Sequence, residues 1–134
     1  MEIIDSRFLV EYFFSDSERV KSRASKHMAH LVETRTGIVP TIAVAEIVRY
    51  VCEKRGREEA RIRQLSLTRS GLLIADLTCE IAREAGLLKC LHPNIPTGDC
   101  IIAATARARK AKILSDDKHF DEIKDISRTW FKVT

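Results

Sequence analysis

The sequence has no hydrophobic run approaching the roughly 18 residues that cross a bilayer, which argues against an integral membrane protein. Residues 1–5 lack the charged and then apolar pattern of a signal peptide. The four cysteines form no C-x-x-C pair, so neither a zinc site nor a disulfide framework is predicted. We expect these cysteines to be buried apolar thiols and the protein to be cytoplasmic.

Aromatic residues are also scarce, at 6% of the chain, so a platform for stacking nucleic-acid bases is not evident. The 134 residues contain no repeat, low-complexity segment or linker, and this length fits a single domain spanning residues 1–134. Hydrophobic residues make up 45%, so a disordered chain is not expected. The net charge of +4 favours a polyanionic partner only weakly.

Hydrophobic periodicity predicts alternating strands and helices along the chain. Short apolar runs predict strands at residues 2–4, 38–40, 72–75, 111–114 and 130–133. Helical spacing predicts helices at residues 5–14, 18–35, 41–55, 58–69, 78–90 and 99–108, and a short helix or turn at 117–123. Ser15, Thr41 and Thr78 are expected to cap helices, and Gly37 to end one. The alternation predicts an α/β fold, a three-layer α/β/α sandwich around a mainly parallel sheet.

Four acidic residues either follow a strand or open a helix. Asp5 comes directly after the first strand, and Asp117 lies three positions after the end of the 111–114 strand. Glu46 sits just over a turn into the helix after the second strand, and Asp99 opens a helix. All four could reach the sheet edge where open α/β folds bind ligands. Taken alone, each aspartate is better explained as a helix cap or a solvated surface residue. Glu46 is harder to explain in this way, because it lies in an apolar segment where a lone carboxylate would lose solvation.

Carboxylates that meet at one edge repel each other. Two of them about 5 Å apart repel by roughly 3 kcal/mol at an effective dielectric constant near 20. A cluster of four is stable only if it takes up protons or holds a cation. Oxygen ligands without Cys or His select Mg²⁺ or Mn²⁺. Water bound to such a cation is more acidic than bulk water and can attack phosphorus, which indicates metal-assisted hydrolysis of a phosphodiester.

Four short motifs follow one another in the chain: IIDSRFL at residues 3–9, VAEI at 44–47, GDCIIAATA at 98–106 and ILSDDKHF at 113–120. In this order and spacing the chain resembles PIN-domain nucleases and, among them, the VapC toxins of prokaryotic toxin–antitoxin pairs. The resemblance implies an α/β/α sandwich whose acidic residues bind Mg²⁺ or Mn²⁺ and whose metal-activated water cuts RNA. It also implies an antitoxin partner, and we expect a homodimer.

The motifs of the resemblance assign catalytic roles to Asp5, Glu46, Asp99 and Asp117. The three aspartates in this set are the expected metal ligands. Ser115 matches a serine or threonine that braces the last acid, although a helix cap is an equal alternative. Asp116 leaves the identity of the fourth acid open, and spacing to Phe120 favours Asp117.

Arg7 departs from the family pattern, which often has asparagine at this position. It could hold phosphate, pair with the acids or point into solvent. Other basic residues gather between residues 41 and 70 and at the end of the 99–108 helix. They form either an ordinary solvated surface or contacts to the RNA backbone, for which the candidates are Arg7, Arg49, Arg107 and Arg109.

Two other functions remain open from the sequence. One is a housekeeping RNA-processing nuclease without an antitoxin. The other is a non-catalytic module of the same fold that binds RNA or protein.

Overall fold

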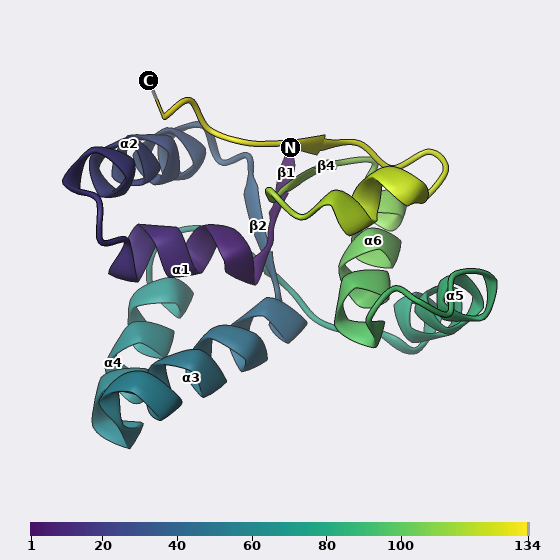
Figure 1. Cartoon of the computed structure of the whole chain (residues 1–134), viewed down its shortest axis with the longest axis horizontal. Helices are drawn as coiled ribbons and strands as arrows, with labels where there is room; N and C mark the ends of the chain where they lie inside the picture. The colour runs from purple at the N-terminus through teal and green to yellow at the C-terminus, as the bar shows by residue number, and fades with distance from the viewer. Residues whose placement is uncertain (134) are drawn as a thin grey trace.

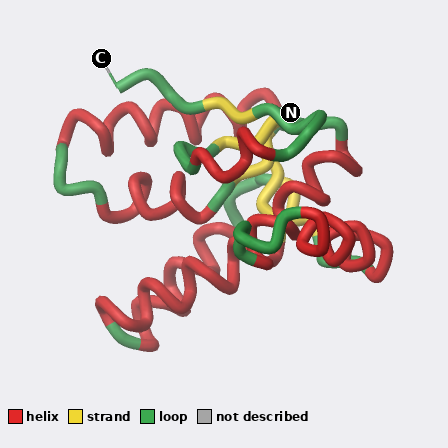
Figure 2. Tube along the Cα trace, turned by 45° about the vertical axis from the view of Figure 1, so that its right-hand side comes forward, coloured by secondary structure: helices red, strands yellow, loops and turns green. Residues whose placement is uncertain are grey.

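A five-stranded parallel sheet forms the centre of the protein in the computed structural model, which describes residues 1–133 (Figures 1 and 2). The strands are β1 (Glu2–Ile4), β2 (Gly37–Pro40), β3 (Leu73–Ala75), β4 (Lys112–Leu114) and β5 (Arg128–Thr129). They lie in the order β3-β2-β1-β4-β5, and each neighbouring pair is parallel. The predicted α/β fold with a central parallel sheet is therefore confirmed.

Helices cover both faces of this sheet. They are α1 (Ser6–Phe14), α2 (Glu18–Thr34), α3 (Thr41–Arg55), α4 (Arg57–Thr68), α5 (Cys79–Leu91), α6 (Thr97–Arg109) and the 3₁₀ helix η1 (Lys118–Glu122). Figure 1 shows α1 to α4 on one side of the strands and α5 and α6 on the other. The predicted three layers are thus present. Among the helices of residues 1–133, none is both long and apolar enough to cross a membrane.

Alternate residues of a strand pack in two separate hydrophobic cores, one on each face of the sheet. In β1, Ile4 packs in the core under α1 to α4, whereas Ile3 packs in the core under α5 and α6. The same division separates Leu114 from Ile113 in β4. Side chains on a strand point alternately to opposite faces, so continuous apolar runs are what a sheet covered on both faces requires. Both cores meet at β1, which fixes the position of the first residue after that strand.

Local boundaries differ from the sequence expectations in α2 and α3. Ser17, not Ser15, caps α2, because its hydroxyl accepts the Val20 N–H at 3.2 Å. The helix ends at Arg35 in the left-handed conformation (φ 57°), so the next strand already includes Gly37. Thr41 is the first residue of α3 and not its cap; its hydroxyl accepts the Leu77 N–H instead.

The last strand also differs from the prediction. β5 comprises Arg128 and Thr129, and the predicted strand at residues 130–133 lies beyond it. The rings of Trp130 and Phe131 lie 6.1 and 5.5 Å from the ring of Phe8, centroid to centroid. The aromatic side chains of this segment therefore pack on α1, and the segment is not a strand of the sheet.

The prediction that the cysteines are buried is wrong for three of the four. Cys52, Cys79 and Cys90 are exposed, and Cys100 is buried. On α5, the residues that face the core are Ala85 and Leu88, so the thiols at residues 79 and 90 fall outside the buried stripe. A small thiol adds little to a core, which makes its position on a helix hard to predict.

Gly37 provides a test of how closely α2 and the residue before β3 approach β2. A Cβ atom at this residue would lie 2.7 Å from Cδ2 of Leu72 and 3.0 Å from Cβ of Leu31. We expect Gly37→Ala to lower the free energy of unfolding by about 1–3 kcal/mol in a urea titration followed by circular dichroism. The matched control is Gly86→Ala in α5, where a Cβ would meet nothing within 4 Å. This control should raise stability by up to about 1 kcal/mol, and effects of equal sign would contradict the packing described.

Candidate active site

Asp5 is held at the end of β1 by two hydrogen bonds to its carboxylate. Its Oδ1 accepts the Ser6 N–H at 2.9 Å, and its Oδ2 accepts the Ser115 hydroxyl at 2.6 Å. The Asp5 N–H also donates to the Leu114 carbonyl at 3.2 Å, which continues the contact between β1 and β4. The residue is only 2% exposed. Its carboxylate is therefore fixed in orientation before any ligand binds.

Ser115 connects the first acid to the last. It follows β4, is fully buried, and donates to Asp5 while its oxygen accepts the Asp117 N–H at 3.0 Å. The sequence suggested that Ser115 braces the last acid. Its hydroxyl instead holds the carboxylate of the first acid, Asp5, and contacts Asp117 only through the backbone. The alternative role as a helix cap belongs to Asp117, whose Oδ1 accepts the His119 N–H at 2.9 Å.

Asp99 and Asp117 form the more accessible part of the cluster. Asp99 lies in the first turn of α6, and its side chain is 14% exposed, against 25% for Asp117. One ligand atom from each of these acids and from His119 lies within 4.8 Å of the others. Three side chains from two segments far apart in sequence thus present donor atoms to one point.

His119 is a site residue that the sequence analysis did not identify. Its Nδ1 lies 3.2 Å from Asp99 Oδ2 and 3.3 Å from Asp117 Oδ1. A hydrogen bond to Asp99 and the charge of Asp117 raise the pKa of this imidazole. The available signal was its position two residues after Asp117 in a tight 3₁₀ turn, which returns both side chains to the same edge.

Glu46 projects from the second turn of α3 toward the N-terminus of α6. Its Oε1 is buried and has no hydrogen-bond partner among residues 1–133. A Cβ at Gly98 would lie 3.1 Å from Glu46 Oε2, so the glycine leaves the space that this carboxylate occupies. Burial, and then the charge of Asp99, raise the pKa of Glu46.

The pKa shifts show that the acids interact with each other. Burial, followed by the charges of Asp99 and Glu46, raises the pKa of Asp5 to about 7. Burial and the charge of Asp117 raise the pKa of Asp99. Thus the four acids predicted to converge interact electrostatically, at the edge where β1 and β4 end and α6 begins. Without a cation, Asp5 keeps its proton up to about neutral pH.

Asp116 has a different set of contacts from its neighbour Asp117. Arg7 Nε donates to Asp116 Oδ1 at 2.8 Å, and Arg7 Nη2 donates to Oδ2 at 3.2 Å. This guanidinium holds the pKa of Asp116 below its ordinary value. Asp117 is therefore the acid of this pair that joins Asp99, and Asp116 is paired with Arg7.

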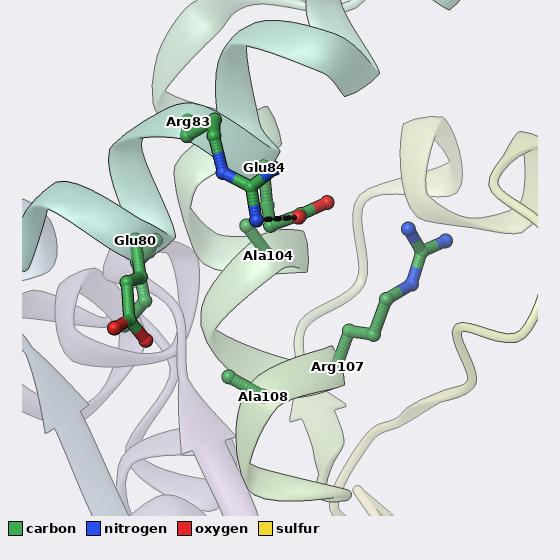
Figure 3. A pocket seen from close by; sticks show the side chains of 7 residues that line it. Glu80, Arg83, Glu84, Ala104, Arg107 and Ala108 are labelled. Atoms are coloured by element: carbon green, nitrogen blue, oxygen red, sulfur yellow. Dashed lines mark ion pairs between the residues drawn. The ribbon is translucent and has the colours of Figure 1, made fainter.

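The other basic residues considered for RNA binding have their hydrogen bonds elsewhere in the structure, although Arg49 is near enough to Glu46 for its charge to oppose the raised pKa of that acid. Arg49 pairs with Glu53 at 2.9 Å, and Arg107 donates to the Lys124 carbonyl at 2.9 Å. Arg109 is exposed at the end of α6. Arg107 borders a pocket of about 370 Å³ between α5 and α6. Figure 3 shows its side chain among those that line this pocket. These three arginines are available at the surface but are not part of one site.

The raised pKa of Asp5 predicts how stability depends on pH in the presence of EDTA. Between about pH 4 and pH 7 the folded protein keeps a proton that the unfolded chain has lost, so the free energy of unfolding falls as pH rises. Asp5→Asn removes this term, because its amide can accept from Ser6 and donate to Ser115. At about pH 8 we expect the variant to exceed the wild type by up to about 4 kcal/mol.

Urea unfolding across this pH range measures the effect. Asp16→Asn, which changes an exposed acid between α1 and α2, is the matched control and should keep the wild-type pH dependence. An Asp5→Asn protein that loses stability as steeply as the wild type would show that Asp5 titrates normally.

Comparison with known proteins places these features in a family. The family model of the PIN domain matches residues 3–126, and a search of curated proteins found no match. Among solved structures, VapBC2 from Rickettsia felis, bound to a DNA fragment from its promoter, is 18% identical over 98% of both chains, with a TM-score of 0.78. VapC20 from Mycobacterium tuberculosis, a sarcin-ricin loop cleaving toxin, is 12% identical over 90% of this chain and 93% of its own, with a TM-score of 0.75.

FitAcB from Neisseria gonorrhoeae is a third similar structure. It is 20% identical over 99% of this chain and 98% of its own, with a TM-score of 0.71. At these identities the likeness shows a shared fold. The family model, by contrast, covers nearly the whole sequence, and the chain belongs to the PIN domain family.

Proposed function

We propose that this protein is an endoribonuclease that depends on Mg²⁺ or Mn²⁺ and acts as the toxin of a toxin–antitoxin pair. The observation that carries the proposal is the convergence of four carboxylates, Asp5, Glu46, Asp99 and Asp117, at one sheet edge. Membership of the PIN domain family and the fold shared with VapC toxins support it.

The residues present fit a divalent cation. Asp99 and Asp117 offer accessible oxygens close together, and each oxygen of Asp5 keeps a lone pair beyond its hydrogen bond. Oxygen donors of this kind suit Mg²⁺ and Mn²⁺. The bound cation would offset the repulsion among the acids and lower the pKa of water.

The chain's own residues divide the remaining tasks. Ser6 and Ser115 fix the Asp5 carboxylate, so Asp5 would hold the cation in a set position beside Asp99 and Asp117. Glu46 Oε1 has no partner and a raised pKa, so it can accept a proton from the attacking water. His119 carries donors next to Asp99 and Asp117 and can give a proton toward the leaving oxygen.

RNA is the proposed substrate, and an antitoxin is the proposed partner. One structural neighbour is described as cleaving the sarcin-ricin loop, and others are toxin–antitoxin complexes. We also propose a homodimer that acts in the cytoplasm. A short reading frame for a DNA-binding protein directly upstream of the gene would favour the toxin over a housekeeping nuclease. RNA binding that is indifferent to chelation would favour a non-catalytic module.

The proposed activity predicts the behaviour of conservative variants of the acids. Asp99→Asn and Asp5→Asn should lower the rate of RNA cleavage in Mn²⁺ at least 100-fold, while circular dichroism shows an unchanged fold. The measurement is incubation with total RNA, followed by mapping of the new ends. Asp16→Asn, which makes the same change at an exposed site, should cleave as the wild type does. Cleavage by Asp99→Asn at the wild-type rate would refute the site assignment.

Metal binding predicts a second result that does not depend on activity. Adding Mn²⁺ at 100 times its dissociation constant should stabilise the folded wild-type protein by about 2.7 kcal/mol. The thermal midpoint should rise accordingly. In Asp99→Asn the same addition should produce a much smaller rise, because an accessible ligand is lost. Equal shifts in both proteins would place the metal elsewhere.

A further inference from the structure

Arg7 lies beside the acid cluster in a fixed orientation. Its Nε and Nη2 atoms donate to the two carboxylate oxygens of Asp116, at 2.8 and 3.2 Å. A two-point pair fixes the plane of the guanidinium as well as its position. The Arg7 side chain is nevertheless 59% exposed, so the guanidinium is both ordered and open to a ligand.

Asp116 leaves much of the hydrogen-bonding capacity of Arg7 unused. The pair occupies the Nε–H and one N–H of Nη2, so the second N–H of Nη2 and both N–H groups of Nη1 can serve a ligand. Planar donors of this kind match phosphate oxygens, and arginine binds phosphate through parallel hydrogen bonds. An arginine ordered in advance loses less side-chain freedom on binding.

The position of Arg7 in the fold places it at the candidate active site. It lies two residues after Asp5, and its partner Asp116 directly precedes Asp117. Arg7 is therefore close to the first and last acids of the cluster. Arg7 is the second residue of α1, the helix that Asp5 caps.

A phosphodiester that approaches the cluster meets repulsion from its carboxylates. A cation at the edge of the cluster offsets this repulsion at the place where the substrate must enter. Arg49 also lies near the cluster, on the side of Glu46, but its partner Glu53 is on its own helix, whereas Asp116 ties Arg7 to the loop that carries Asp117. Arg107 donates to the Lys124 carbonyl, outside the cluster. Arg7 combines exposure, order and proximity to Asp5 and Asp117.

We propose that Arg7 binds a phosphate of the RNA beside the cleaved bond, and that Asp116 holds the Arg7 guanidinium in the binding position. Asp116 is then a positioning residue, and the two adjacent aspartates have separate tasks. The inference rests on the proposed ribonuclease function, since it names how that site holds its substrate.

The test measures RNA binding in full-length protein that carries Asp99→Asn, so that the RNA stays intact. The probe is a short fluorescein-labelled single-stranded RNA of mixed sequence, followed by anisotropy over a range of salt concentrations. Arg7→Gln should weaken binding about tenfold and reduce the slope of log Kd against log salt by about 0.7, the value for one lost phosphate contact on a single strand. A merely structural role for Arg7 would leave the slope unchanged, and that result would overturn the proposal.

Arg83→Gln is the matched control, because it removes the same charge from an exposed ion pair. Arg83 lies on α5 and pairs with Glu84 at 3.0 Å. Figure 3 marks this pair with a dashed line. This variant should bind RNA with the affinity and salt slope of its parent. Losses equal to those of Arg7→Gln would mean that overall charge, and not a specific contact, controls binding.

A double-mutant cycle tests the role of Asp116. If Asp116 orients Arg7, then Arg7→Gln should cost less affinity in an Asp116→Asn background than in the parent. An equal or greater cost would overturn the positioning role, since Asp116 would then be indifferent or would compete with phosphate. Cleavage by the protein without Asp99→Asn, in Mn²⁺, is measured separately. Its absence would count against the ribonuclease proposal and would leave the binding results intact.

Discussion

The mutual repulsion of four carboxylates at one sheet edge is the constraint on which the rest of this structure depends. Parallel strands bring these residues together, and burial removes the water that would screen them. Hydrogen-bond donors offset part of this repulsion. The Ser6 N–H and the Ser115 hydroxyl donate to Asp5, and the His119 ring contacts Asp99. Because these contacts offset only part of the cost, the pKa of Asp5 remains raised, to about 7. A carboxylate cluster of this kind is stable when it is partly protonated, and a bound cation would displace those protons.

Two adjacent aspartates in the loop after β4 have different partners. Both lie beyond the end of β4 at Leu114 and before η1. Asp117 also caps the 3₁₀ helix, which fixes its side chain near Asp99, whereas Asp116 turns to Arg7 on α1. The pair therefore ties the loop after β4 to two different elements. Removing either contact would loosen the position of the other.

Much of the fold could be predicted because its signals are local, and the parts that could not depend on tertiary contacts. Continuous apolar runs between helices revealed β1, β2 and β4, and the acids that follow them. Ser15 and Ser17 are equally good caps, so the start of α2 depends on where the chain leaves α1. The Trp130-Phe131 segment is apolar whether it pairs in a sheet or packs on Phe8. His119 was missed because Asp99, its partner, lies 20 residues earlier and only the fold brings them together.

The distribution of charge links the cation and the RNA in the proposed enzyme. The chain has a net charge of +4, yet Arg49, Arg63 and Arg128 each pair with a carboxylate, so these arginines add little positive charge to their own surroundings. Phosphate would therefore meet repulsion at an acid cluster without a cation. A bound divalent cation reduces that repulsion and so strengthens RNA binding. Coupling between two ligands is reciprocal, so RNA must strengthen cation binding by the same factor. Low cation affinity in the free protein is thus compatible with firm binding in the complex with substrate.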